Sequence, residues 1–420
     1  MRCSTIWDSQ QNGGPDGDMW LTGMPVGARK LGAATGAGPH LALGSDSSSI
    51  DPLDGLSRQV YGVLGIPIDA ISIGEVAQRI DAAAKAKEPF LISTPNLNFL
   101  VSSLYDADFR ESLLLSDLCP VDGVPIVWIA RLLSVPIQSR VAGSDIFDAL
   151  KALSRRTTGF LFGGPPGVAD AAARTLNAQS SGMYCVGTFY PGYCSVEEMS
   201  TDNIIEPINA TKAEFLVVSL GAKKGQDWLV QNHHRLTIPV RSHLGAAINF
   251  EGGTLKRAPK IVRKCGVEWL WRIKEEPHLW IRYWKDGWVL LRLMLTCVLP
   301  LAVSLRWHSH WKARRTDNLV AEVVERPAST MIRFAGAATA NDVEGAIRHF
   351  RAALSKEKDV VLDLSRLEFL DARFFGLFLM VRKQLRSNGR RLGFSGLSGR
   401  ARKIFRLNGF DYLLDKEDLV

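Results

Sequence analysis

The sequence predicts an α/β protein with a Rossmann-like parallel sheet, a helical appendage and a small C-terminal α/β domain. Three observations predict this organisation. From about residue 60 to residue 253, short apolar strands alternate with amphipathic helices, the pattern of a parallel sheet covered on both faces. Residues 256–311 are basic and rich in tryptophan, and after a polar segment with Pro327 a second strand–helix alternation begins.

The elements of the first alternation follow one another with short turns. Helical spacing is clearest at 71–87, where Ile73, Val76, Ile80 and Ala83 share one face. The segments that we read as strands, helices or strand–turn–helix units are 60–69, 71–87, 89–96, 97–117, 118–133, 159–176, 183–193, 213–233 and 238–253. In such sheets, ligands bind beyond the carboxyl ends of the strands. The polar and glycine residues that fall there are Thr94, Asn96, Asp122, Gly163, Gly164 and Gly221.

The appendage combines cations with aromatic residues. Ten Lys/Arg face four Asp/Glu between Lys256 and Arg292, and seven of the eleven tryptophans lie in 256–311. Tryptophan suits the membrane–water boundary and arginine suits phosphate. Residues 293–305 are uncharged but too short to span a bilayer, and Pro300 should kink them, so we expect an interfacial or re-entrant helix. The alternative is a helix pair packed on the sheet with a solvated basic face.

The second alternation predicts an independent domain of about ninety residues. Its strands and helices are expected at 331–336, 341–357, 359–367, 372–389, 390–397 and 398–414. The predicted organisation of the chain is a disordered segment at 1–57, a Rossmann-like domain at 58–255, the appendage at 256–311, a linker at 312–328 and the small domain at 329–420.

Composition narrows the classes of partner. The net charge of +8 and pI near 9.2 favour anionic partners, namely nucleic acid, acidic lipid or sugar nucleotides. The positive charge gathers in 256–315, and zinc-finger spacing and RNP-type motifs are absent from the sequence, so we expect no nucleic-acid partner. None of the six cysteines forms a CxxC pair, which is typical of isolated thiols in a reducing compartment.

Five motifs occur in a fixed order: 93–101 (STPNLNFLV), 119–133 (CPVDGVPIVWIARLL), 140–150 (RVAGSDIFDAL), 160–176 (FLFGGPPGVADAAARTL) and 256–284, with its RAP…EWLWR…EP…RY string. Together they resemble the WecG/TagA/CpsF family of bacterial glycosyltransferases over about residues 60–290. The resemblance implies transfer of a sugar, often of the N-acetylmannosamine type, from a UDP-sugar donor to a polyprenyl-diphosphate-linked acceptor in cell-surface polysaccharide biosynthesis.

The resemblance also implies an inverting reaction without a metal or other cofactor. The expected place is the cytoplasmic face of the bacterial inner membrane, with a peripheral or monotopic attachment. Self-association is implied as well. The resemblance thus implies a site where cationic side chains replace Mg²⁺ at the leaving diphosphate.

Asp122 is the candidate general base. An inverting transfer needs a carboxylate that takes the proton of the acceptor hydroxyl, and Asp122 lies in a Val-Asp-Gly turn after an apolar strand. It matches the base proposed for the family, although a turn without catalysis is the alternative. Thr94 and Asn96 match the family's Thr-Pro-Asn motif in the active site, and capping of the next helix is compatible with that role.

The candidate donor-binding residues are Arg140, Gly163, Gly164, Lys223, Lys224 and Gln226. Arg140 would neutralise charge on the UDP leaving group. The two glycines allow close approach of a phosphate to a helix N-terminus, or form only a tight turn. The family usually has Gly-x-Pro-Lys-Gln-Glu near 221–227, whereas this chain has Lys223 for the proline and Gly225 for the glutamine. Gln226 replaces that glutamine only with a one-residue shift, and Lys223 and Lys224 are the alternative phosphate ligands.

Arg257, Arg272 and Arg282 are the candidate ligands of the acceptor diphosphate. In the family this region closes over the active site. The alternative is a structural ion-pair network, in which Glu268 pairs with a neighbouring arginine.

Residues 360–381 (VVLDLSRLEFLDARFFGLFLMV) resemble a STAS domain. That family typically has a phosphorylatable serine where this chain has Ala372, so we expect a module that binds a protein partner or positions another part of the chain. A generic four-stranded α/β domain is the alternative. The competing hypothesis for the whole protein is a non-catalytic, membrane-associated regulator or sugar-nucleotide sensor that acts through this domain.

Overall fold

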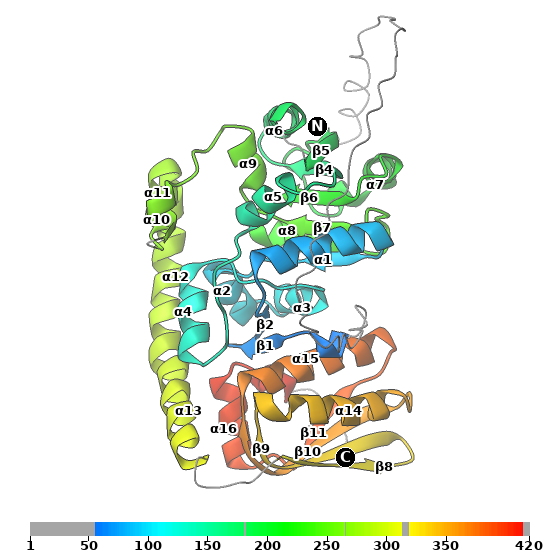
Figure 1. Ribbon diagram of the computed structural model, residues 1–420, viewed down its shortest axis with the longest axis vertical. Helices are drawn as coiled ribbons and strands as arrows, with labels where there is room; N and C mark the ends of the chain where they lie inside the picture. The colour runs from blue at the N-terminus through cyan, green and yellow to red at the C-terminus, as the bar shows by residue number, and fades with distance from the viewer. Residues whose placement is uncertain (1–54, 180–181, 265, 313–318, 415–420) are drawn as a thin grey trace, which may run out of the picture.

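The computed structural model describes residues 55–179, 182–264, 266–312 and 319–414. Figure 1 shows two α/β units stacked along the long axis of the molecule, with one long helix running beside both. We call residues 55–255 the N-terminal unit, 256–312 the appendage and 319–414 the C-terminal unit. The expected disordered segment 1–57 lies mostly outside the described residues, but Leu56 in the short helix η2 (Gly55–Ser57) is buried.

The N-terminal unit is built on a five-stranded parallel sheet with strand order β3-β7-β6-β4-β5. This confirms the predicted α/β class and parallel sheet. The strands are β3 (Phe90–Ile92), β4 (Thr157–Gly163), β5 (Met183–Phe189), β6 (Phe215–Ser219) and β7 (Val240–His243). An antiparallel hairpin, β1 (Val60–Val63) and β2 (Ile66–Asp69), stands apart from the sheet and faces the C-terminal unit.

Helices cover both faces of this sheet, and its central strands β6 and β4 are almost entirely buried. The helices are α1 (Ile73–Ala86), α2 (Leu97–Tyr105), α3 (Ala107–Leu115), α4 (Val124–Leu132), α5 (Gly143–Lys151), α6 (Val168–Gln179), η3 (Glu198–Ser200), α7 (Asp202–Ala210), α8 (Ala222–Gln231) and α9 (Ala247–Glu251). Helix α1 begins at a capping box between Ser72 and Glu75, and it buries Val76 and Ile80 as its spacing predicts.

The appendage contains α10 (Lys260–Lys264) and α11 (Glu268–Glu275), and then one continuous helix. That helix, Pro277–Trp307, joins η4 (Pro277–Leu279), α12 (Trp280–Leu293), the π-helical turn η5 (Met294–Val298) and α13 (Leu299–Lys312). Within the described residues it is the one helix long and apolar enough to cross a membrane by length and composition. The π turn immediately precedes Pro300, which has no N–H to donate, so a local change of helix type replaces a break.

One side of the long helix is apolar and exposed. Its members recur every three or four residues and form one stripe, namely Trp280, Trp284, Trp288, Leu291, Leu295, Leu299, Val303 and Trp307. The opposite side packs on the protein, where Val298, Leu301 and Ala302 are buried. We call the exposed set the apolar stripe.

The C-terminal unit has a four-stranded sheet with order β11-β10-β9-β8, in which only the β8–β9 pair is antiparallel. Its elements are β8 (Val320–Glu325), β9 (Ser329–Ala338), η6 (Ala340–Asp342), α14 (Val343–Leu354), β10 (Asp359–Leu370), α15 (Ala372–Ser387), β11 (Leu392–Ser395), α16 (Gly399–Leu407) and η7 (Asp411–Leu413). The predicted linker at 312–328 is therefore wrong at 320–325, where a valine-rich segment pairs with β9. Residues 313–318 lie outside the described part of the chain.

The two units share one apolar core. Leu56, Val60 and Leu114 of the N-terminal unit pack among the buried residues of the C-terminal unit. Helix α15 lies on β1 so closely that a Cβ atom at Gly376 would stand 2.0 Å from the Val60 carbonyl oxygen. The buried Arg373 donates to that same oxygen at 2.9 Å.

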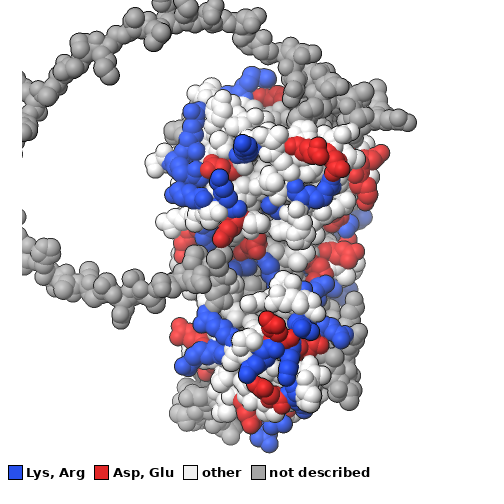
Figure 2. Space-filling view, turned by 90° about the vertical axis from the view of Figure 1, so that its right-hand side faces the viewer, with Lys and Arg blue, Asp and Glu red and all other residues white. Residues whose placement is uncertain are grey.

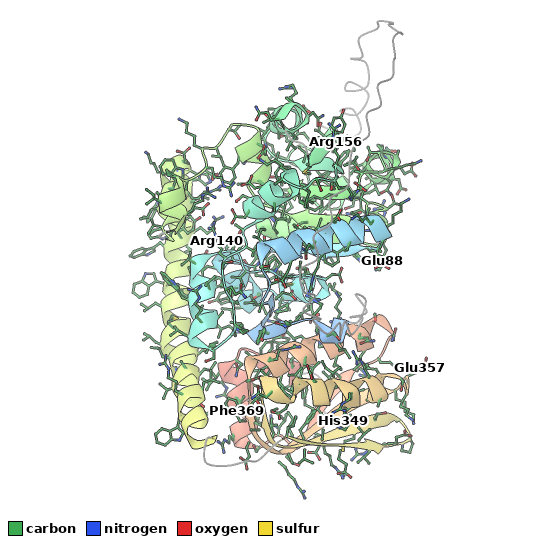
Figure 3. The ribbon with its side chains drawn as sticks, viewed as in Figure 1. Glu88, Arg140, Arg156, His349, Glu357 and Phe369 are labelled. Atoms are coloured by element: carbon green, nitrogen blue, oxygen red, sulfur yellow. The ribbon has the colours of Figure 1, made fainter. Side chains whose placement is uncertain are left out.

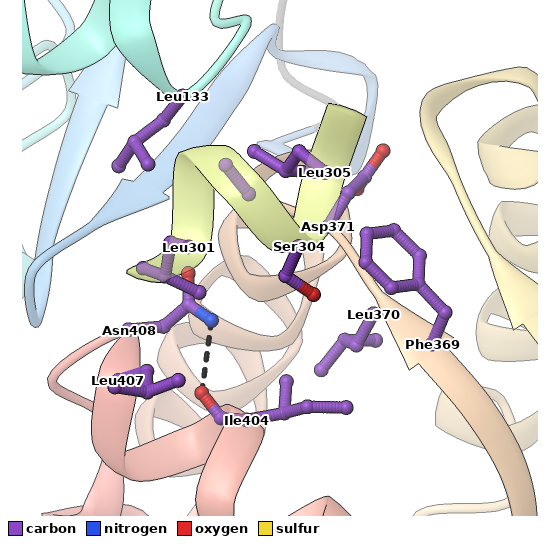
Figure 4. Close-up of a pocket in the computed structure, with 11 residues that line it drawn as sticks. Leu133, Leu301, Ser304, Leu305, Phe369, Leu370, Asp371, Ile404, Leu407 and Asn408 are labelled. Atoms are coloured by element: carbon purple, nitrogen blue, oxygen red, sulfur yellow. Dashed lines mark hydrogen bonds between the residues drawn. The ribbon is translucent and has the colours of Figure 1, made fainter. Parts of the chain in front are cut away.

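The long helix also contacts the C-terminal unit. A cavity of about 40 Å³ lies where α13 meets the start of α15 and the end of α16. Figure 4 shows Leu301 and Leu305 of α13 facing Ile404 and Leu407 of α16 across it. Ala372, which stands where the STAS family typically has a phosphorylatable serine, is buried at this junction.

Candidate active site

Two turns meet at the carboxyl-end edge of the N-terminal sheet. The first follows β3 and contains Thr94 and Asn96, and the second contains Asp122 and Gly123. The Asp122 amide donates to the Pro95 carbonyl at 2.8 Å, and a Cβ atom at Gly123 would lie 3.5 Å from the Asn96 Cβ. Gly123 has φ 115°, which favours glycine at this close approach.

The two polar residues of the first turn serve the fold as well. Asn96 caps α2, because its Oδ1 accepts a hydrogen bond from the Phe99 amide at 3.1 Å. Thr94 is buried. The expected capping of the next helix is therefore present, at the same place where Asn96 adjoins the Asp122 turn.

Arg140 lies beside Asp122. The Val141 amide donates to the Val121 carbonyl at 2.7 Å, which brings the two segments together. The Arg140 guanidinium pairs with Glu268 of α11 at 2.5 Å and with Asp145 of α5 at 3.5 Å. Figure 3 shows Arg140 between the N-terminal unit and the appendage.

The environment of Asp122 changes its acidity. Burial, together with the negative charges of Glu268 and Asp145, raises the pKa of this carboxyl to about 7. The Arg140 charge and a hydrogen bond from the Gly143 backbone act in the opposite direction. A carboxyl with a pKa near 7 exchanges its proton readily at neutral pH.

A second layer of charges holds the appendage near this site. Arg257 pairs with Asp145 at 2.5 Å and also with Asp148, and Arg263 reaches Asp145 at 3.7 Å. Arg257 thus joins the appendage to α5, as the alternative of a structural ion-pair network expects. It contacts acids rather than open space.

The other two appendage arginines differ from each other. Arg272 pairs with Glu276 on the same helix and lies 5.8 Å from the Phe250 ring. Arg282 is exposed. Its guanidinium lies 5.2 Å from the Tyr283 ring and near the charge of Asp286. Of the three, Arg282 is the most accessible to an anionic ligand.

The turn between β4 and α6 contains Gly163 and Gly164, with φ 94° and 82°. A Cβ atom at Gly163 would lie 2.5 Å from the Ser219 carbonyl oxygen, so a larger residue does not fit there. Asn249 faces this turn, and its Oδ1 is buried with no hydrogen-bond partner among the described residues. Asn249 is not among the residues predicted from the sequence, although its place shortly after the end of β7 marks it as a candidate.

The structure does not bring the 223–226 residues to Asp122. Lys223 pairs with Asp106 at 2.7 Å, at the far end of α2 from Asn96. Gln226 is fully buried and donates to the Ser93 hydroxyl at 2.7 Å. In this conformation an acid holds Lys223 and a hydroxyl holds Gln226, and the donor contacts of these two side chains stay predictions. Lys224 is half-buried and has no ion pair among the described residues.

Gly225 explains why the usual glutamine is missing. A Cβ atom at this position would lie 2.2 Å from the His243 ring, whose Nε2 is 2.7 Å from the Leu220 carbonyl oxygen. The buried His243 thus takes the space of a side chain at 225. Across the described ranges, no three His, Cys, Asp or Glu side chains are grouped to hold a metal ion.

Comparison with known proteins gives two matches to families. Residues 61–302 match the glycosyl transferase WecG/TagA/CpsF family, and residues 321–415 match a STAS domain family described as Mlab. A solved antisigma-factor antagonist STAS domain from Rhodobacter sphaeroides matches 20% of this chain and 92% of its own length, at 22% identity and a TM-score of 0.16.

Curated relatives of the first region share one name, N-acetylglucosaminyldiphosphoundecaprenol N-acetyl-beta-D-mannosaminyltransferase. The relative from Bacillus spizizenii is 25% identical over 199 residues, which are 47% of this chain and 75% of the relative. The Bacillus subtilis protein is 24% identical, over 46% of this chain and 74% of its own. The Staphylococcus aureus protein is 22% identical over 214 residues, covering 50% and 82% of the two chains.

Proposed function

This chain belongs to the WecG/TagA/CpsF family of glycosyltransferases and ends in a STAS domain, and on that premise we propose its reaction. It transfers an N-acetylmannosamine-type sugar from a UDP-sugar to a polyprenyl-diphosphate-linked acceptor, with inversion. The relatives' name supports the acceptor class. The observation that carries the proposal is the pair of Asp122 and Arg140, a carboxyl and a guanidinium side by side where the turn after β3 meets the Asp122 turn.

Asp122 acts as the general base. Its carboxylate takes the proton of the acceptor hydroxyl while that oxygen bonds to the anomeric carbon of the donor sugar. The bond from the anomeric carbon to the diphosphate breaks on the opposite face, and its electron pair leaves with UDP. A base with a raised pKa is strong enough to accept the proton and is still ionised in part at neutral pH.

Arg140 compensates the charge that develops on the leaving diphosphate. A guanidinium donates two parallel hydrogen bonds to phosphate oxygens and stays charged at any physiological pH. The Gly163–Gly164 turn leads into the N-terminus of α6, where backbone N–H groups favour a phosphate. Asn249 offers a free acceptor oxygen to a donor hydroxyl at the same turn.

The apolar stripe would rest on the bilayer surface, with the acceptor's lipid chain in the membrane beside it. The inner side of the long helix packs on α2, α4 and α16, so both units flank it over its length. We infer that a helix which packs on the protein along one side, and exposes the apolar stripe on the other, lies in the membrane plane rather than across it. On the side that faces away from the helix, Lys/Arg and Asp/Glu are interspersed (Figure 2). We place the enzyme on the cytoplasmic face, where UDP-sugars are made.

The proposal is tested by turnover of a UDP-sugar panel with membranes that contain a lipid-diphosphate acceptor. Asp122→Asn should lower the rate by about 10²–10⁴-fold, because it removes the base, and leave UDP binding intact. Asp227→Asn, on α8 beside Lys223, is the matched control and should keep full activity. Full activity of Asp122→Asn would exclude the base assignment, and no turnover of any donor would favour the non-catalytic regulator.

A further inference from the structure

The appendage touches the candidate active site through one carboxylate. Glu268 is the first residue of α11, and its Oε2 lies 2.5 Å from Arg140 Nη1. Both side chains are largely buried, with 18% and 17% of their surface exposed. Arg140 is the only ion-pair partner of Glu268 within the described residues.

The three acids around Arg140 are not equivalent. Asp145 lies farther from Arg140 and is shared with Arg257 and Arg263, so its charge is compensated elsewhere. Asp122 is the proposed base. Glu268 differs from both, because it comes from the appendage and can leave together with α11.

Little else fastens α11 to the N-terminal unit. No residue of α11 is buried. Among the described residues, Arg272 meets the N-terminal unit only through the long contact with the Phe250 ring. The Trp271 indole donates to the Lys256 carbonyl, which belongs to the appendage itself. Just before the helix, Gly266 lies against Val124 of α4. The contact between Glu268 and Arg140 is therefore a large share of what holds α11 closed.

We propose that Glu268 occupies the place of the donor's diphosphate on Arg140 in the empty enzyme, and that UDP displaces it and releases α11. The inference rests on the proposed role of Arg140. A carboxylate and a phosphate present the same kind of oxygen acceptors to a guanidinium, so one replaces the other. Both anions cannot remain, because the diphosphate would add like charge beside Glu268, Asp145 and Asp122.

UDP is the probe, and the full-length protein is used. Glu268→Gln removes the competing charge and keeps the shape of the side chain, so UDP should bind about fivefold more tightly. Glu276→Gln is the matched control, since it removes the same charge from the end of the same helix and should leave UDP affinity unchanged. Arg140→Gln should weaken UDP binding at least tenfold.

Hydrogen–deuterium exchange gives the second readout. UDP should speed exchange in 268–276 of the wild type, and Glu268→Gln should show the fast exchange without UDP. Unchanged or weaker UDP binding by Glu268→Gln, or slower exchange of α11 with UDP, would overturn the displacement of Glu268 by UDP. If Arg140→Gln still loses UDP binding in that case, the proposed function stays in place. Wild-type UDP affinity in Arg140→Gln would overturn both the role of Arg140 and the displacement of Glu268.

Discussion

The N-terminal unit holds its two neighbours in opposite ways. Helix α11 of the appendage buries no residue and contacts the unit mainly through charges around Arg140. Helix α15 of the STAS domain buries eleven of its sixteen residues, and its core is continuous with that of the N-terminal unit. Charges appear at the rim of the α15 contact, where Glu111 pairs with Arg382 and Arg386.

This difference separates a part that can move from a part that cannot. An anionic ligand can replace a carboxylate on an arginine at little net cost, so the α11 contact is exchangeable. Separating α15 would expose apolar surface, which costs about 25 cal/mol for each Å². We expect the STAS domain to act as a fixed brace for the hairpin and α13, and α11 to open and close.

The largest expected effect comes from a substitution at Gly376, which tests the close contact between α15 and β1. In Gly376→Ala the new methyl group would lie 2.0 Å from the Val60 carbonyl oxygen, a backbone atom that cannot move aside easily. The unfolding free energy should therefore fall by about 3 kcal/mol. Urea denaturation measures this, and both units should unfold in one transition.

Gly345→Ala in α14 is the matched control in the same domain. A Cβ atom there meets nothing within 4 Å, so this substitution should stabilise the helix by about 0.5–1 kcal/mol. Equal tolerance of the two substitutions would contradict a tight contact between the units.

We expect the apolar stripe to give the appendage a second attachment, to the membrane. Replacing Trp284 and Trp288 by serine should weaken binding to vesicles of anionic lipid by about 2–3 kcal/mol, at least thirtyfold, since both indoles are exposed and free to enter the interface. Thermal stability should not change. Tyr193→Ser, an exposed aromatic residue in the loop after β5, is the control for vesicle sedimentation, and equal binding by all variants would argue against the stripe.

The raised pKa of Asp122 should make the stability of the protein depend on pH. The pKa of Asp122 is about 7 in the folded protein and about 4 in the unfolded chain, so the folded state holds its proton more tightly. The resulting stabilisation is present below pH 4 and is lost as the pH rises through 7. Asp122→Asn should therefore be more stable than the wild type at pH 8, by about 1–2 kcal/mol after allowance for solvent screening, and equally stable at pH 4. Melting curves at the two pH values decide this, and an equal difference at both would exclude the raised pKa.

The smallest expected effect is that of salt, which should distinguish the α11 contact from the α15 contact. Raising NaCl to 1 M shortens the Debye length to about 3 Å and weakens partly exposed ion pairs. Exchange in 268–275 should speed up by a few fold, whereas exchange in 372–387 should stay the same. A similar response in both helices would mean that α11 is not held by charge.

The sequence predicted the classes of structure well, because periodicity and turn chemistry are local. The spacing of Val76 and Ile80 predicts their burial, and the glycine after Asp122 predicts the turn in which Asp122 lies. The alternation of apolar strands and helices likewise predicted the parallel sheet. The resemblance to the family indicated Arg140, whose partner Glu268 is distant in the chain.

The missed features depend on contacts between distant segments. The sequence alone suggests Gln226 as a site residue, but in the fold its side chain is buried and bonds to Ser93 and Ser112. It also suggests a linker at β8, but β8 pairs with β9. The pair of Arg140 and Glu268 joins residues 128 positions apart. No local pattern specifies which arginine meets which acid.

Under the proposed function, the long helix lies on the membrane and changes how the enzyme finds its acceptor. Its 31 residues extend for about 46 Å, and the apolar stripe runs along them. An enzyme lying flat on the bilayer searches in two dimensions, where the surface density of the lipid-linked acceptor replaces its bulk concentration. Only the donor arrives from solution, so the two substrates reach the site from different phases.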